Sequence, residues 1–345
     1  MSVGFFPLDE QLAVSARVWS EGVERLAVWL SGAVSSFALV EEVLAQVGQV
    51  SLSCASIWRV TQAAGQQFQA LEAVERVRAN ALPAQWTPPS RAEVSDQRMG
   101  VALDGVLVNL RTEGWKEVKL ATVFDLVLTS TPKPQTQEAV ERAQAVHTSY
   151  VAHLGGPETL GELAWAEARR RGWEQAQDSQ VLGDGAVWIW QQAALHFGTS
   201  QQTVDWYHAL QHLTEAARLL KGEGTPAFTR WRTRSETLLY QGQAARIADA
   251  LDQAATRPGS EGLAREAAYF RTHQRRMNYL ELRENGWLIG SGVVESGAKQ
   301  IKARFCGPGM RWSRKGAEHL LPIRTAVMSH RFDATWAAAK NLPPL

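Results

Sequence analysis

The sequence predicts a mixed α/β fold, in which a five-stranded sheet is covered by helices and follows a helical N-terminal region. Two observations carry this prediction. Residues 101–127 contain two segments that are apolar on both faces, as central strands of a sheet are. Residues 180–220 then alternate strand-like and helix-like segments, a pattern that indicates strands joined by covering helices.

Composition excludes several classes of protein. The 345 residues are 45% hydrophobic with a formal net charge of +1, which excludes a wholly disordered chain and fits two or three domains. The two cysteines, Cys54 and Cys306, lie in no Cys-x-x-Cys pair, so no zinc ribbon or disulfide framework is predicted. The longest uncharged run, 26–40, is too short to span a bilayer. We therefore expect a cytoplasmic protein with no membrane partner.

The first 80 residues are predicted to form a helical domain, and the proline-containing stretch 81–97 is predicted to be a linker. A helix from Phe37 to about 48, a short turn and a second helix from Cys54 could make a helix-turn-helix, with Ser51 or Ser53 as the second N-cap. Such a unit would offer three side chains to a DNA groove, namely Ser56, Arg59 and Gln62. Because any two short helices look similar, a purely structural helix pair is the alternative.

The core is predicted to occupy 98–220 as its first part and 286–335 as its last part. We expect two strands at 101–110 and 118–127 with a turn at 111–114, then a loop at 129–137 and a third strand around 147–153. A helix from Pro157 to about Arg171 is expected next, followed by a fourth strand at 180–184 and a helix through His196. A fifth strand at 202–207 and a further helix end this part. Residues 221–285 look purely helical and highly charged, and are predicted to be an insertion. The final helix is expected to begin near Ser291, a favourable N-cap.

Three acidic residues stand out by their positions. Asp104 lies within the first apolar strand, Asp184 ends the fourth strand, and Glu295 lies in the first turns of the final helix. Ligands of open α/β sheets gather at the carboxyl ends of strands, which favours a functional role for Asp184. Each residue also has a structural interpretation, because both aspartates precede glycine as in hairpin turns, and Glu295 could pair with Lys299 on the helix surface.

Taken together, the three acids indicate a metal site. A carboxylate inside an apolar strand is costly unless it is paired or bound to a metal. Carboxylates are ligands suited to Mg²⁺ or Mn²⁺, and three of them could hold two ions that act on a phosphodiester.

A basic segment follows Glu295. Residues 296–331 contain eight Lys or Arg and one acid, Glu318, a local charge of 8 − 1 = +7. Such a patch could contact DNA phosphates, and its binding would weaken with salt. A solvated basic face is the alternative. The predicted DNA contacts are Arg59, Lys299, Lys302, Arg304, Arg311, Arg314 and Lys315.

Seven motifs, in order along nearly the whole chain, resemble those of bacterial insertion-sequence transposases of the DDE class, in particular the Kra-type group. They are Gly-Phe-Phe-Pro-Leu-Asp-Glu at 4–10, Asp-Gly at 104–105 with Gly-Trp-Lys-Glu-Val-Lys at 114–119, Thr-Ser-Tyr-Val-Ala-His-Leu at 148–154, Leu-Gly-Asp-Gly-Ala-Val-Trp-Ile-Trp at 182–190, Val-Asp-Trp-Tyr-His at 204–208, Ile-Gly-Ser-Gly-Val-Val-Glu-Ser at 289–296 and Gly-Met-Arg-Trp-Ser at 309–313.

The resemblance implies an RNase H-like core and a catalytic triad of Asp104, Asp184 and Glu295 that binds two Mg²⁺, for which Mn²⁺ can substitute. It implies cleavage at element ends and transfer of the freed 3′-hydroxyl into target DNA. It also marks Asp205 and His208, on the fifth strand and at its exit, as accessory residues, and implies a DNA-binding domain near the N-terminus. The expected partners are double-stranded DNA and further copies of the chain, in a homodimer or a higher oligomer.

Two other readings stay open from the sequence: a silent or domesticated transposase that only binds DNA, and a stand-alone RNase H-like nuclease. Relatives often carry a zinc-binding Cys motif before the segment at 4–10. This chain begins almost at that segment, so its mode of end recognition is open.

Overall fold

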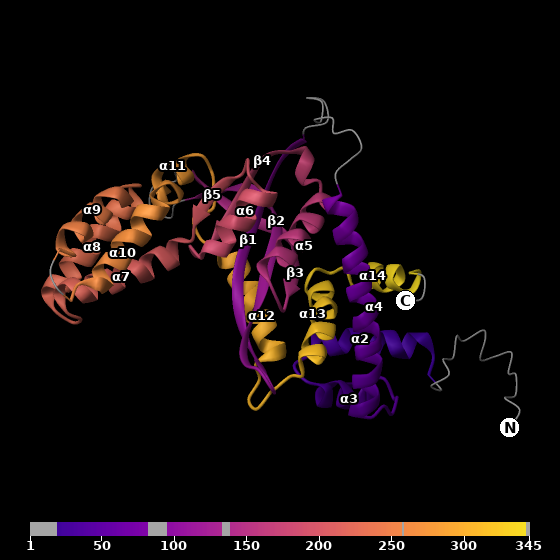
Figure 1. Ribbon diagram of the computed structural model, residues 1–345. Helices are drawn as coiled ribbons and strands as arrows, with labels where there is room; N and C mark the ends of the chain where they lie inside the picture. Colours follow the sequence, from indigo (N-terminus) through magenta and orange to yellow (C-terminus); the bar gives the residue numbers. More distant parts are fainter. Residues whose placement is uncertain (1–18, 82–94, 133–138, 257–258, 343–345) are drawn as a thin grey trace, which may run out of the picture.

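A five-stranded mixed sheet lies at the centre of the protein, with helices on both faces (Figure 1). The computed structural model describes residues 19–81, 95–132, 139–256 and 259–342. The strands are β1 (Ser95–Leu110), β2 (Gly114–Pro132), β3 (Ala139–His153), β4 (Ala176–Gly183) and β5 (Gln201–Val204), in the order β3-β2-β1-β4-β5. The first three form an antiparallel meander, whereas β4 is parallel to β1 and β5 is parallel to β4. The predicted mixed sheet flanked by helices is therefore confirmed.

The sequence of β1 is apolar on both faces because both faces of this strand are buried. Met99, Val101 and Leu103 are buried in the core on one side of the sheet. Ala102 and Val106 are buried in the core on the other side. Because successive residues of a strand point to opposite faces, Asp104 belongs to the second face.

Different helices cover the two faces. The face of Met99 packs against α5 (Pro157–Arg170), α6 (Val187–His196) and α7 (Trp206–Lys221). The opposite face packs against α12 (Gly292–Phe305) and α13 (Arg314–Met328). Helix α12 turns an apolar stripe toward the sheet, made of residues at helical spacing: Val294, Ala298, Ile301 and Phe305.

The insertion between β5 and α12 is helical, as predicted, and forms a lobe beyond the β5 edge (Figure 1). Its elements are α8 (Pro226–Tyr240), α9 (Ala244–Ala254), α10 (Glu261–His273), the short 3₁₀ helix η2 (Gln274–Met277) and α11 (Tyr279–Glu284). Helix α7 runs from the sheet into this lobe, so the lobe and the core share one continuous helix (Figure 1).

The N-terminal helices share a core with the C-terminal end of the chain. They are α2 (Glu21–Ala33), α3 (Phe37–Gln46) and α4 (Cys54–Asn80), capped by Ser20, Ser36 and Ser53. Their buried side chains pack with those of α13 and of α14 (Phe332–Lys340). The boundary predicted at residue 80 therefore separates helices that are packed together.

Several predicted element boundaries are wrong. Residues 129–132, expected in a loop, extend β2, where Thr129 pairs with Arg142, and β3 begins at Ala139. The fourth strand begins earlier than expected, after the 3₁₀ turn η1 (Trp173–Gln175). The fifth strand ends at Val204, because the side chain of Asp205 caps α7. The motif at 4–10 and most of the predicted linker, 82–94, lie outside the described residues.

Within the described ranges, no helix combines the length and the apolar character that crossing a bilayer requires.

Candidate active site

Asp104 lies on β1, and Asp184 directly follows the end of the neighbouring strand β4. The parallel register pairs Ala102 of β1 with Leu182 of β4. Asp104 comes two residues after Ala102, and Asp184 comes two residues after Leu182. Both Ala102 and Leu182 belong to the core under α12. The alternation of strand side chains therefore directs Asp104 toward α12, and the charge of Asp184 acts on Asp104 from the end of β4.

The surroundings of Asp104 are unfavourable for a free carboxylate. Burial raises the pKa of Asp104, and the charge of Asp184 raises it further. A hydrogen bond from the Gly105 amide to Oδ1, at 2.7 Å, and the charges of His208 and Lys302 act in the opposite direction. Two carboxylates that repel each other at one end of a sheet fit a divalent cation, because a cation removes the repulsion.

Asp184 is held in a tight turn between β4 and α6. Its Oδ1 accepts a hydrogen bond from the Ala186 amide at 2.7 Å, and its backbone oxygen accepts one from the Tyr269 hydroxyl at 3.0 Å. Gly185 has a φ of +108°, and a Cβ there would lie 2.7 Å from the Tyr269 ring. Since α6 follows at once, the hairpin interpretation of this Asp-Gly pair is wrong.

Asp205 is fully buried, and its carboxylate joins two segments. Its carboxylate accepts hydrogen bonds from the His208 amide at 2.8 Å and from the Ser291 amide at 2.5 Å, and it contacts His208 Nδ1 at 3.0 Å. Burial alone would raise the pKa of Asp205, but the hydrogen bonds from His208 and Ser291 outweigh it and lower the pKa. Asp205 therefore stays ionised and ties the start of α7 to the segment that precedes α12.

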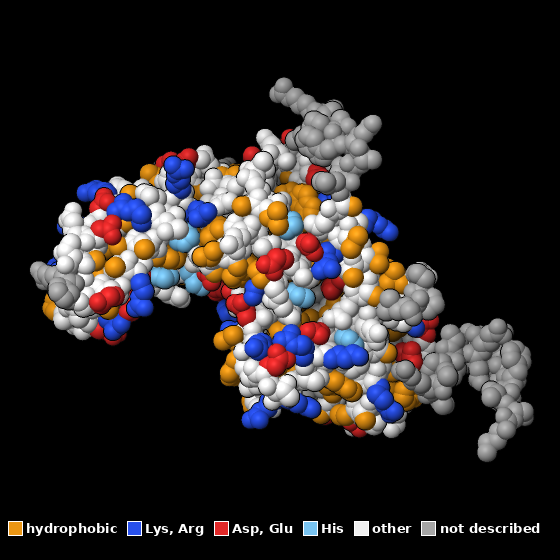
Figure 2. Space-filling view, viewed as in Figure 1, with side chains coloured by type: hydrophobic (Ala, Val, Ile, Leu, Met, Phe, Trp, Pro, Cys, Tyr) orange, Lys and Arg blue, Asp and Glu red, His pale blue; other side chains and the backbone are white. Residues whose placement is uncertain are grey.

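His208 lies beside Asp104 and Asp184, whose charges favour a proton on its ring. The hydrogen bond with Asp205 raises the pKa of His208 against the effect of burial, and the charges of Asp184 and Asp104 raise it further. Figure 2 shows His side chains, in pale blue, where the helical lobe meets the sheet, next to acidic side chains. The accessory residues inferred from the resemblance thus lie next to Asp104 and Asp184.

Glu295 is not grouped with the two aspartates as a metal ligand. It lies in the first turn of α12, and its side chain makes no hydrogen bond or ion pair with the described residues. Across the described ranges, no three His, Cys, Asp or Glu side chains are close enough to hold one metal ion. The structure therefore supplies a two-carboxylate site, and Glu295 could complete it only after its side chain moves.

The predicted DNA contacts differ in their exposure. Arg59, Lys299, Lys302, Arg311 and Lys315 are exposed. Lys302 also acts electrostatically on Asp104, which places the basic face of α12 beside the two aspartates. Arg314 is engaged in ion pairs with Glu113 at 2.6 Å and Glu318 at 3.3 Å.

The prediction that Arg304 contacts the DNA backbone is wrong. Its side chain is 1% exposed, and its Nε donates to the backbone oxygen of Ser31 at 2.7 Å. The last carbonyl groups of α2 attract a guanidinium, because they lack partners within their own helix. Arg304 therefore fastens α12 to α2.

The predicted groove-reading face of α4 is also largely unavailable. Ser56 is buried, and Gln62 donates to the backbone oxygen of Gly316 at 3.4 Å. Of the three side chains, only Arg59 is exposed, and it donates to Ser56 Oγ at 3.2 Å. A helix pair with Ser53 as the second N-cap is present, but α13 covers most of its expected DNA-reading side.

The sequence did not reveal two contacts that organise the site. They are the hydrogen bond from the Tyr269 hydroxyl to Asp184 and the one from the Ser291 amide to Asp205. Tyr269 is separated from Asp184 by 85 positions and lies inside the helical insertion, so no local pattern connects them. Ser291 was predicted as a helix N-cap, but its side chain makes no capping hydrogen bond, and its amide binds Asp205 instead.

Neither a scan of protein-family models nor a search of curated proteins finds a match to this chain. The likeness to DDE transposases therefore rests on the motifs in the sequence and stays a prediction.

Proposed function

We propose that this chain is a DNA transposase of the DDE class, with an RNase H-like sheet. It would cleave double-stranded DNA at the ends of a mobile element and join the freed 3′-hydroxyl to target DNA. Two active sites are needed to act on two ends, so the working form would be a dimer or a higher oligomer. The observation that carries the proposal is the mutual proximity of Asp104, Asp184 and the Asp205–His208 pair, in which the charges of the first two aspartates act on His208.

The donor set fits a hard divalent cation, since its members are carboxylates. Asp104 and Asp184 would hold Mg²⁺, or Mn²⁺ in its place, and Glu295 would complete a two-ion set after moving toward them. Bound there, the metal would make a water or a 3′-hydroxyl a stronger nucleophile and neutralise charge on the phosphate.

The other residues of the site bind and position. Lys299 and Lys302 lie on the exposed side of α12 and would contact the phosphates that flank the scissile bond. His208, when protonated, would attract the same phosphate from its place next to Asp104 and Asp184. Asp205 fixes the orientation of His208 and the start of α12 through its hydrogen bonds.

The test is cleavage of supercoiled DNA that contains the gene with its natural flanking sequences, in the presence of Mn²⁺. Asp184→Asn is expected to abolish strand cleavage and to leave DNA affinity within about twofold, because the variant removes a metal-binding charge rather than a phosphate contact. Asp178→Asn is the matched control, since Asp178 lies on the same strand and is largely exposed. Cleavage by Asp184→Asn at the wild-type rate would refute the proposal.

The isolated position of Glu295 favours a second candidate, a protein that binds element DNA without cutting it. This candidate predicts that wild type and Asp184→Asn bind DNA equally and that neither cleaves it at any Mn²⁺ concentration. Analysis of the products separates both candidates from a stand-alone nuclease, because only a transposase joins a 3′ end to a second DNA molecule.

A further inference from the structure

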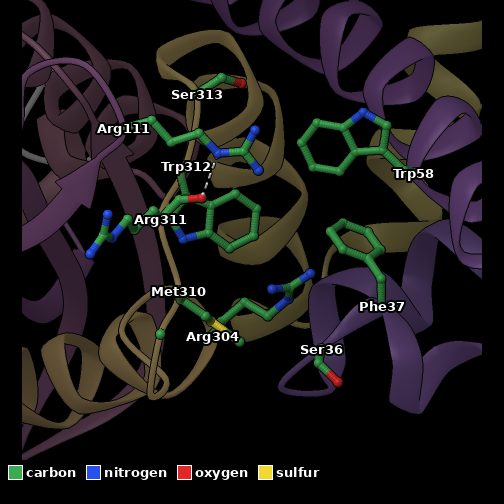
Figure 3. A pocket seen from close by; sticks show the side chains of 10 residues that line it. Ser36, Phe37, Trp58, Arg111, Arg304, Met310, Arg311, Trp312 and Ser313 are labelled. Carbon is green, nitrogen blue, oxygen red and sulfur yellow. Dashed lines mark hydrogen bonds between the residues drawn. The ribbon is translucent and has the colours of Figure 1, made fainter.

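A pocket of about 660 Å³ lies where the N-terminal helices meet the β1–β2 turn and the segment 309–313 (Figure 3). Its volume is in the range of small-molecule sites. The residues on which the inference depends are Phe37, Trp58, Trp312, Arg111, Arg304 and Arg311. None of them belongs to the carboxylate site.

Three aromatic rings form one wall of this pocket. The Trp58 and Trp312 rings are stacked with centroids 6.3 Å apart, and Phe37 meets Trp58 edge-on at 5.3 Å. Trp58 and Phe37 are only partly buried, so ring surface remains open to the pocket. Aromatic faces of this kind stack with flat ligands, including every nucleobase.

Arg304 supplies a buried donor that lacks an acceptor. Its Nε and Nη1 donate to the backbone oxygens of Ser31 at 2.7 Å and Ser35 at 3.4 Å. Its Nη2 is buried without a hydrogen-bond partner, although a buried donor without an acceptor destabilises a fold. The guanidinium carbon lies 4.6 Å from the Phe37 ring centroid, and Figure 3 shows the group directed toward that ring.

The positive charge of Arg304 is also not neutralised. No carboxylate of the described residues forms an ion pair with it, and burial together with nearby Arg324 lowers its pKa to about 10. Arg304 therefore remains charged at neutral pH, and a ligand that brings an electron-rich acceptor would relieve the unpaired donor.

Two exposed arginines extend the positive charge to the mouth of the pocket. Arg111 Nε donates to the backbone oxygen of Arg311 at 3.2 Å, the contact dashed in Figure 3. Neither guanidinium forms an ion pair within the described part of the chain. The mouth of the pocket can thus bind a phosphate group, while the aromatic wall and Arg304 contact the part of the ligand that enters the pocket.

We propose that this pocket binds one unpaired nucleotide, with its base against the partly exposed Trp58 and Phe37 rings and its phosphate at Arg111 and Arg311. The base would offer a ring nitrogen or carbonyl oxygen to the free donor of Arg304, as guanine does to arginine in DNA complexes. A paired base fits less well, because its flat faces are covered by its neighbours in the duplex.

The source of the nucleotide follows from the proposed function, on which this step rests. Arg304 lies nine residues after Glu295 on α12, which is about 14 Å along the helix axis. That distance is about four base steps of a duplex. One DNA end can therefore reach both the carboxylate site and the pocket, and we infer that the nucleotide belongs to the DNA strand being processed.

The test uses the full chain without divalent metal and duplexes in which one 2-aminopurine is either unpaired or fully paired. The unpaired duplex is expected to bind about tenfold more tightly, about 1.4 kcal/mol, with quenched 2-aminopurine fluorescence as the base stacks. Arg311→Ala should weaken binding of the unpaired duplex about tenfold and leave that of the paired duplex nearly unchanged. Arg234→Ala, an exposed arginine of α8, is the matched control and should change neither.

Trp58→Leu should abolish the quenching, and circular dichroism checks that this variant folds. Arg311 is exposed, so its variant tests the pocket even where Trp58→Leu does not fold. Free deoxyadenosine monophosphate is a separate arm: competition at millimolar concentration supports a nucleotide pocket that also accepts the free monomer, and no competition supports one that needs a DNA strand. Equal affinity for paired and unpaired duplexes, or no loss in Arg311→Ala, would overturn the proposal.

The assay also separates this proposal from the proposed function. Quenching that depends on Trp58 and Arg311, without strand cleavage by the wild type in Mn²⁺, would retain the pocket and remove the enzyme. Strand cleavage that depends on Asp184, without fluorescence quenching, would retain the enzyme and remove the pocket.

Discussion

The Tyr269 hydroxyl donates a hydrogen bond to the backbone oxygen of Asp184, so a helix of the insertion holds the turn that carries a candidate metal ligand. The ring also lies against Gly185, where a side chain would collide with it. Burial and the charge of Asp184 raise the pKa of Tyr269, so the hydroxyl stays protonated and remains a donor. The lobe is thereby part of the support of the site.

Tyr269→Phe removes this hydrogen bond and keeps the ring. A hydrogen bond contributes about 0.5–1.5 kcal/mol, so we expect strand cleavage to slow by about 2- to 10-fold while DNA affinity is retained. The measurement is the cleavage rate in Mn²⁺ at saturating protein. Tyr240→Phe is the control, because the Tyr240 hydroxyl donates no hydrogen bond to the described residues. Equal rates for the two variants would show that Tyr269 does not position Asp184.

Asp205→Asn is expected to lower the pKa of His208. In the wild type, Asp205 favours protonated His208, which raises that pKa above its ordinary value of 6.5. Without the carboxylate charge, His208 should lose its proton at a lower pH and be largely neutral at pH 7.5. Nuclear magnetic resonance of ¹³C-labelled histidine reports the midpoint, and Asp178→Asn is the control. A His208 midpoint that is unchanged in Asp205→Asn would contradict the coupling.

Glu72 on α4 should make the protein less stable at high pH. Burial and nearby Glu75 raise the pKa of Glu72 to about 8 from 4.5. The folded state then holds a proton that the unfolded state has lost, so stability falls as pH rises from about 4.5 to 8. Glu72→Gln removes this effect. At pH 9, the melting temperature of this variant should exceed that of the wild type, and at pH 5 the two should differ little. Each 1 kcal/mol gained in the free energy of unfolding should raise the melting temperature by roughly 2 °C.

The control for Glu72 is Glu284→Gln, an exposed position on α11 that should shift the melting temperature equally at both pH values. A Glu72→Gln variant with the same pH dependence as the wild type would mean that Glu72 is ionised in the folded protein at pH 7.

Gly65→Ala is expected to destabilise the packing of α4 on α13. A Cβ at Gly65 would collide with the backbone oxygen of His319, which a side-chain rotation cannot relieve. Overpacking of this kind costs about 1–3 kcal/mol in the free energy of unfolding. Gly22→Ala on α2 is the matched control, since its Cβ would lie 3.8 Å from the nearest atom, Ser20 Oγ. Urea unfolding measures the stability of the two variants. Similar unfolding midpoints would argue against a close approach of Gly65 to the backbone of His319.

Segments that are apolar on both faces were enough to predict the central strands. Prediction failed where tertiary contacts override local composition. Residues 129–132 read as a loop because they are Ser, Thr and Pro, yet pairing with β3 extends the strand through them. Asp205 read as part of a strand because its neighbours are apolar, yet its side chain caps α7.

For the site, the sequence located the acidic residues and placed Asp104 on a central strand and Asp184 at the end of another. It could not place Glu295, because the position of a helix over a sheet depends on packing from distant parts of the chain. Arg304 illustrates the same limit: its charge suggested a surface role, and only its approach to the end of α2 explains its burial.

Helices α2–α4 complete their core only with Ile323, Phe332 and Trp336, from the opposite end of the chain. During synthesis, these helices leave the ribosome well before the residues that cover them, which follow more than 200 positions later. A nascent polypeptide that lacks residues 323–336 therefore exposes their apolar surfaces, and helices α2–α4 cannot complete their core before that segment is made.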